Sequence, residues 1–89
     1  MAQVFFTAHL RAVVDASHVD ADGTVVGEAL DRVFTANPRL KGYVLDEQGA
    51  VRKHVAIFLD GMRLPNDEAL AAPIAASSEI YVMQALSGG

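Results

Sequence analysis

A single amphipathic helix is predicted between strand-like segments, and it limits the folds open to this chain. Four apolar residues recur with the spacing of one helical face: Val26, Leu30, Val33 and Phe34. Thr24 is expected to be the N-cap, since its hydroxyl is available to the free N–H groups of the first turn. Asn37-Pro38 should end the helix, because the residue before a proline disfavours the α-helical region. One apolar stripe needs one sheet face to cover it.

Strand-like segments lie on both sides of this helix. Five short ranges are expected to form strands: 3–8, which is apolar, aromatic and β-branched, followed by 17–20, 51–59, 62–64 and 80–86. Asp60-Gly61 is a hairpin turn between the third and fourth of them, and ranges 40–45 and 66–75 can each hold a short helical turn. The order β-β-α-β-β-β predicts an α+β chain of the β-grasp class, with a mixed sheet, one main helix and one uncovered sheet face. The first and last strands are expected to be adjacent and parallel.

Alternation along the strands separates two sets of side chains. Toward the helix we place Val4, Phe6, Val55, Ile57, Leu59, Ile80 and Val82. Outward we place Phe5, Thr7, Ala56, Phe58, Tyr81 and Met83. An outward patch with three aromatic rings and a methionine is typical of a protein-binding surface. The alternative is scattered apolar exposure of the ordinary kind, and a one-residue register shift would exchange the two faces.

The chain ends in Ser87-Gly88-Gly89, directly after an apolar strand. Glycine has no Cβ, so the last residues can enter a channel too narrow for other side chains. From about Leu86 onward nothing can supply core contacts, and residues 86–89 are expected to form a mobile arm that carries the Gly89 carboxylate. The alternative is a terminus that is only frayed or left over from cloning.

Composition favours one small folded domain over residues 1–89 and excludes several functions. Apolar residues make up 52% of the chain and charged residues 20%, which is typical of a globular protein. The absence of cysteine excludes disulfides and thiolate catalysis, and the net charge of −4 argues against nucleic acid as a partner. No apolar run is long enough to span a membrane and no signal peptide is visible, so a cytoplasmic protein is expected.

Neither a metal site nor a catalytic site is expected. The three histidines, His9, His18 and His54, are too scattered along the chain to suggest metal ligation. No pair of a nucleophile and a base is visible either. The chain is therefore expected not to be an enzyme in its own right.

Four stretches of the chain resemble the ubiquitin-like sulfur carriers, which include the small subunit of molybdopterin synthase and the thiamin sulfur carrier. They are VFFTAHLR near the start, DGTVVGEALDRVF at the helix, VAIFLDG in the central strand and EIYVMQALSGG at the end. The resemblance covers nearly the whole chain. The extended loop within residues 45–63 is most similar to the carrier of cysteine biosynthesis, because the other two carriers are usually shorter there.

The resemblance implies chemistry at Gly89. In this family a separate E1-like activating enzyme uses ATP to adenylate the terminal carboxylate, and sulfur then replaces AMP to leave a thiocarboxylate. Ser87 and Gly88 are implied to thread into that enzyme, and a sulfur-accepting synthase is the implied second partner. No tightly bound cofactor is implied. Partner binding is assigned to the outward patch and the strand end, namely Phe5, Phe58, Tyr81, Met83 and Leu86.

Three functions remain open at this point. The chain is a sulfur carrier, or a protein modifier joined through Gly89 to target lysines, or a β-grasp interaction module whose tail is incidental. A carrier and a modifier need the same Gly-Gly end and the same adenylation. The sequence does not name the end product, which can be cysteine, molybdopterin, thiamin or a related metabolite.

Overall fold

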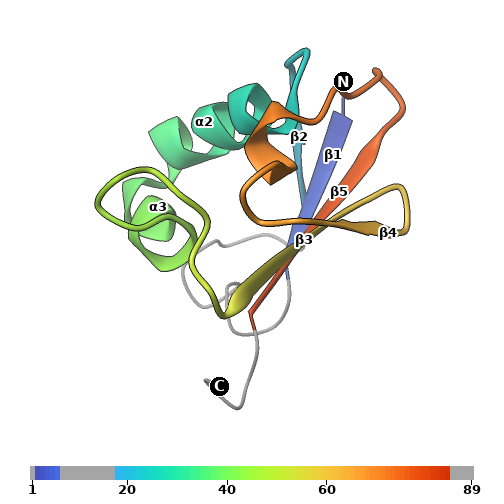
Figure 1. Cartoon of the computed structure of the whole chain (residues 1–89). Coiled ribbons are helices and arrows are strands. Elements are labelled where there is room, and N and C mark those ends of the chain that lie inside the picture. The colour runs from blue at the N-terminus through green and yellow to red at the C-terminus, as the bar shows by residue number, and fades with distance from the viewer. Residues whose placement is uncertain (1, 7–17, 85–89) are drawn as a thin grey trace.

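The computed structural model describes residues 2–6 and 18–84, in which a mixed sheet packs against helices (Figure 1). The strands are β1 (Ala2–Phe6), β2 (His18–Ala21), β3 (Val55–Leu59), β4 (Met62–Leu64) and β5 (Glu79–Gln84). The helical elements are α2 (Val26–Ala36), α3 (Pro38–Val44) and the 3₁₀ turn η1 (Ala69–Ala71). The first strand was predicted over 3–8 and the last over 80–86, so residues 7–8 and 85–86 of those predictions lie outside the described residues.

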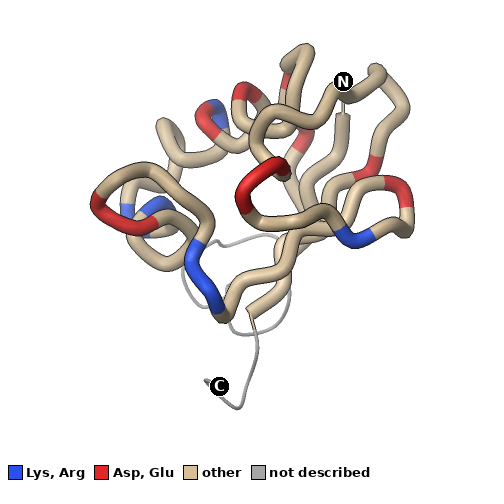
Figure 2. The backbone as a smooth tube through the Cα atoms, viewed as in Figure 1, with Lys and Arg blue, Asp and Glu red and all other residues tan. Residues whose placement is uncertain are grey.

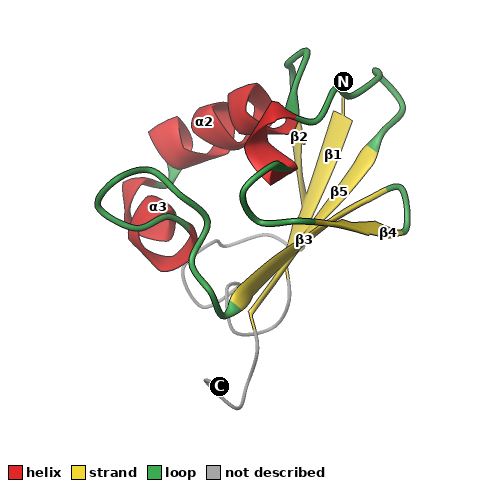
Figure 3. Cartoon of the chain, viewed as in Figure 1, coloured by secondary structure: helices red, strands yellow, loops and turns green. Residues whose placement is uncertain are grey.

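The sheet has the strand order β2-β1-β5-β3-β4. β1 and β5 are adjacent and parallel, as predicted, and the other neighbouring strands are antiparallel. Figure 3 shows the helices together on one side of the sheet. The tight turn after β3 uses positive φ angles at Asp60 (50°) and Gly61 (89°), which suit aspartate and glycine in a two-residue hairpin. This is the α+β, β-grasp arrangement that the sequence predicts.

Helix α2 begins one residue later than predicted, at Val26, with Val25 and not Thr24 as the N-cap. Val25 is held extended by an antiparallel bridge to Pro73, and the Val26 N–H donates to the Ala72 carbonyl. The Thr24 N–H and hydroxyl instead both donate to Glu28 Oε1, at 2.6 and 2.7 Å. These bonds hold the pKa of Glu28 below its usual value, because they stabilise the ionised carboxylate. The prediction of Thr24 as N-cap was wrong, since pairing with a distant segment decides where the helix starts.

The prediction that α2 ends at Asn37-Pro38 is confirmed. The Asn37 N–H donates to the carbonyls of Val33 and Phe34, and Pro38 then opens α3. Proline suits this first helical position because its missing N–H would have no intrahelical partner. The short turn expected over residues 40–45 is a seven-residue helix that contributes Leu40 and Val44 to the core.

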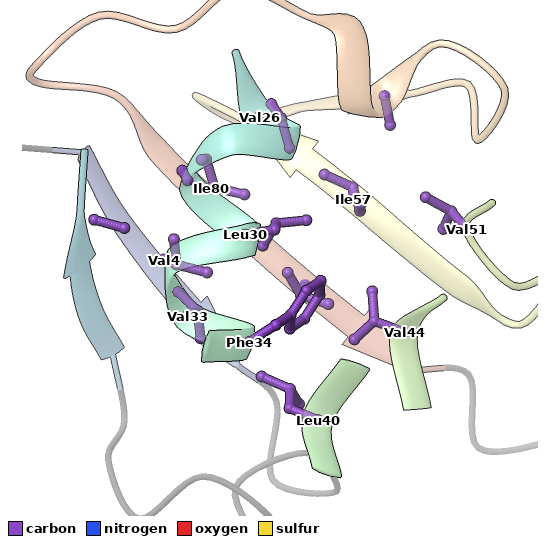
Figure 4. Close-up of a cluster of buried hydrophobic side chains, with 14 of the residues drawn as sticks. Val4, Val26, Leu30, Val33, Phe34, Leu40, Val44, Val51, Ile57 and Ile80 are labelled. Atoms are coloured by element: carbon purple, nitrogen blue, oxygen red, sulfur yellow. The ribbon is translucent and has the colours of Figure 1, made fainter. Parts of the chain in front are cut away.

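The core lies between α2, α3 and one face of the sheet (Figure 4). All four residues of the predicted helical stripe are buried. Six of the seven sheet residues placed toward the helix are also buried: Val4, Phe6, Val55, Ile57, Ile80 and Val82. Leu59 packs against this cluster but is only half-buried, at the end of β3 beside the hairpin turn. Strand register was therefore predicted correctly.

The central strand was predicted over 51–59 but begins at Val55. Val51 instead forms an isolated bridge with Leu45, which closes a small loop. Within this loop the Asp46 carboxylate accepts hydrogen bonds from the N–H groups of Ala50 and Gln48, and these bonds lower its pKa. A turn at residues 53–54 follows, where the Asn66 side-chain amide donates to the carbonyls of Arg52 and Val55.

Candidate partner-binding face

The side of the sheet away from the helices carries the predicted outward residues, and we call it the open face (Figure 3). The register places on it Gln3, Phe5, His18, Asp20, Ala56, Phe58, Arg63, Glu79, Tyr81 and Met83. Phe5, Ala56, Phe58 and Tyr81 are half-buried, and Met83 is 36% exposed. Thr7 and Leu86, which were also assigned to this surface, lie outside the described residues.

One row of side chains crosses the whole open face. Paired positions bring together, in order, His18, Phe5, Tyr81, Phe58 and Arg63, one from each strand. The Phe5 and Tyr81 rings stack with centroids 4.6 Å apart and planes 11° apart. The His18 ring lies 5.3 Å from Phe5, tilted by 30°. Rings with centroids this close stack against each other instead of lying flat side by side on the sheet.

His18 and Arg63 were not recognised as part of this surface from sequence. A signal was available for each of them. The Asp60-Gly61 turn fixes the pairing of Phe58 with Arg63, and alternation in β2 places His18 on the side opposite Val19. They add a polar group at either end of the aromatic row.

Acidic residues gather at one end of the open face, where β5 begins. Asp20 and Glu79 are exposed on either side of Gln3, and Asp60 lies at the hairpin turn beside Glu79. The Glu79 N–H donates to Asp60 Oδ1 at 2.8 Å, and the Asp60 N–H donates to the Glu79 carbonyl at 2.9 Å. We call Asp20, Asp60 and Glu79 the acidic end.

The opposite end, where β5 stops, is basic. A shallow hollow of about 290 Å³ lies there, lined by Lys53, His54, Val55, Ala56, Arg63, Met83 and Gln84. Figure 2 shows a basic stretch just before β3 and an acidic one where β3 turns into β4. We call Lys53 and His54 the basic end, with Arg63 on its flank. The open face is therefore apolar in the middle and oppositely charged at its two ends.

The chain leaves the sheet at the basic end. β5 is the middle strand of the sheet, and its last residue, Gln84, pairs with Val55. Ser87, Gly88 and Gly89, the predicted threading and activation residues, lie outside the described residues. The structure thus fixes the point from which residues 85–89 continue.

Other kinds of site can be assessed only for the described residues. No group of His, Asp and Glu there is arranged to hold a metal ion. Within residues 2–6 and 18–84, no helix is both long and apolar enough to cross a membrane. On the helix side, a hollow of about 360 Å³ lies between α2, α3 and η1, with Leu30, Phe34, Leu45 and Leu70 among its lining.

Comparison with known proteins places this fold in a family. No protein-family model matches the chain. Over 72 residues it is 33% identical to small archaeal modifier protein 1 of Haloferax volcanii, a match that spans 80% of this chain and 78% of that protein. The chain belongs to the ubiquitin-like family of small archaeal modifier protein 1.

Solved structures agree with this membership. The crystal structure of the Haloferax volcanii family member matches with a TM-score of 0.81 and 28% identity, over 99% of this chain and 98% of that chain. A chain of the Amycolatopsis orientalis BexX/CysO complex matches with a TM-score of 0.88 and 19% identity, over 100% of both chains. At that identity the second match supports the β-grasp fold alone.

Proposed function

We propose that this chain is a sulfur carrier whose Gly89 carboxylate is activated by an E1-like, ATP-dependent enzyme. The observation that carries the proposal is the open face, with its row of half-buried rings across the sheet; one of them, Tyr81, lies on β5, the strand that continues toward Gly88-Gly89. Apolar and aromatic surface of this kind is typical of a protein interface. Membership in a ubiquitin-like family supports the same reading.

In the proposed reaction a carboxylate oxygen of Gly89 attacks the α-phosphorus of ATP, and pyrophosphate leaves. A sulfide equivalent from a sulfur donor then attacks the acyl carbon and displaces AMP, which leaves a thiocarboxylate. A sulfur-accepting synthase takes the sulfur from there. An α-carboxyl group has a pKa of about 3.5, so it is ionised at neutral pH and needs no base. The chain itself contributes only the delivery of the Gly89 carboxylate. The activating enzyme binds the folded domain, and this binding positions the terminal residues at the ATP. The proposal sets this chemistry in the cytoplasm.

A second candidate is a protein modifier joined through Gly89 to a lysine of a target protein. The observation that favours it is the 33% identity to a protein named as a modifier. Intact mass of the protein from its native cell separates the two. A carrier is heavier by the replacement of one oxygen with sulfur, whereas a modifier appears in branched conjugates.

Deleting Gly89 tests both candidates against an interaction module with an incidental tail. The new terminus would fall short of the ATP α-phosphate by one residue, roughly 3.5 Å of extended chain. Since a misplacement of about 1 Å can cost about 100-fold in rate, ATP–pyrophosphate exchange with the activating enzyme of the source organism should fall at least that much. The thermal midpoint should not change.

Two substitutions at Gly88 provide the matched comparison. Gly88→Phe should block threading, and Gly88→Ala should reduce exchange less, because its side chain is smaller. If the protein without Gly89 supports exchange at the wild-type rate, the carrier and the modifier both fail, and the interaction module becomes the best description.

A further inference from the structure

The open face is self-complementary in charge. Its acidic end and its basic end lie on either side of the aromatic row, about 17 Å apart along β5 at roughly 3.3 Å per residue. A two-fold axis that lies in the interface and runs perpendicular to the strands brings the acidic end of one copy over the basic end of another. An axis parallel to the strands would instead place like charges together. Charge therefore selects one of the two face-to-face arrangements.

Side-chain size fits the same arrangement. Going from the acidic end toward the basic end on the open face, the large Phe58 of β3 is followed by the small Ala56. In the same direction along β5, Tyr81 is followed by the flexible Met83. If the axis passes between these two rows, Phe58 lies over Ala56 of the second copy and Tyr81 over Met83. A large side chain then meets a small one, and a ring meets a thioether, which is a favourable contact. Glu79 and Asp60 lie toward Lys53 and His54 of the second copy.

We propose that the open face binds a second copy of this chain in this antiparallel register. A second copy is the occupant that the charges favour, because it carries the same open face. In this register each acidic end meets the basic end of the other copy. Five strands about 4.8 Å apart, none longer than the six residues of β5, offer less area than the ~800 Å² per partner of a standard interface, so the dimer should be weak and reversible. The dimer would cover the face assigned to activating and accepting enzymes, and each copy would have to dissociate before it is used.

Sedimentation velocity of the whole protein tests this directly. Between about 20 μM and 1 mM, the wild type should show a rising weight-average mass, a range suited to weak association. Glu79→Lys places a positive charge in the acidic end, and Lys53→Glu places a negative charge in the basic end. Each variant alone should associate roughly tenfold more weakly, since two exposed attractions become two repulsions. An equimolar mixture of the two should recover wild-type association.

The controls are Glu68→Lys and Lys41→Glu, which make the same changes in net charge at exposed positions away from the open face. They should associate like the wild type, and thermal melts should show that all four variants are folded. The proposal is overturned by a wild type that stays monomeric at the highest concentration, by a mixture no better than its components, or by controls that weaken association equally. None of these results depends on the exchange assay, so the sulfur-carrier proposal stands or falls separately.

Discussion

At the scale of single residues, alternation along β1, β3 and β5 divides the sheet into two environments. Ile57 and Val82 are fully buried under the helices, whereas their neighbours Phe58 and Met83 lie on the open face with part of their surface in solvent. The fold should therefore tolerate an aspartate at position 58 or 83. A protein interface that covers these positions should not, because the carboxylate would lose its contact with water. This difference allows binding to be tested apart from stability.

We expect Phe58→Asp and Met83→Asp to weaken binding to the activating enzyme by about 30-fold, as for a substitution at the centre of an interface. Isothermal titration or the concentration dependence of exchange measures this. Met62→Asp is the control, because Met62 is 72% exposed on an edge strand outside the aromatic row. Binding equal to wild type in both central variants would exclude the open face as the docking surface.

At the scale of elements, glycine positions show how tightly segments approach one another. Gly42 lies in α3, and a Cβ there would meet no atom within 4 Å. At Gly23 a Cβ would lie 2.8 Å from the Ala29 backbone nitrogen and 2.9 Å from Glu28 Cβ. The same substitution should therefore have opposite effects at these two positions.

Gly42→Ala should stabilise the protein by about 0.5–1 kcal/mol, because alanine favours the helix and nothing has to move. Gly23→Ala should destabilise it by about 1–3 kcal/mol, because the start of α2 must shift to make room. Urea unfolding measures both. Equal effects of the same sign would mean that the approach at Gly23 is looser than described.

The same scale shows what the sequence could predict. Local chemistry was sufficient where one segment decides the outcome: the Asp60-Gly61 turn, the end of α2 before Pro38, and the period-two pattern of β3 and β5. It was insufficient where two distant segments meet. Pairing of Val25 with Pro73 moved the start of α2, and pairing of Leu45 with Val51 shortened the central strand. The charge pattern of the open face also depends on the register between strands, which no single segment reveals.

At the scale of the whole molecule, acid should reduce stability through two carboxylates. Glu28 and Asp46 each have a lowered pKa in the folded state, owing to hydrogen bonds from Thr24 and from Ala50 and Gln48. A group with a lower folded pKa contributes stability above its unfolded pKa, roughly pH 4, and loses it as the pH falls through the folded value. The thermal midpoint should therefore drop steadily between about pH 5 and pH 2.

Glu28→Gln and Asp46→Asn should each lower the thermal midpoint at pH 7 and make its acid dependence shallower than in the wild type. Asp67→Asn, at an exposed aspartate, serves as the control and should leave the curve unchanged. Melting curves of the two test variants that run parallel to the wild type across this range would show that other groups cause the acid sensitivity.

The place of β5 at the middle of the sheet has a mechanical consequence. β5 is hydrogen-bonded to β1 on one side and to β3 on the other. A force that draws the chain outward from Gln84 runs along the strand, so it loads both ladders of hydrogen bonds in shear and at the same moment. An edge strand such as β4, pulled along its own axis, would load one ladder only. β5 is thus suited to resist a partner that pulls on the residues after Gln84.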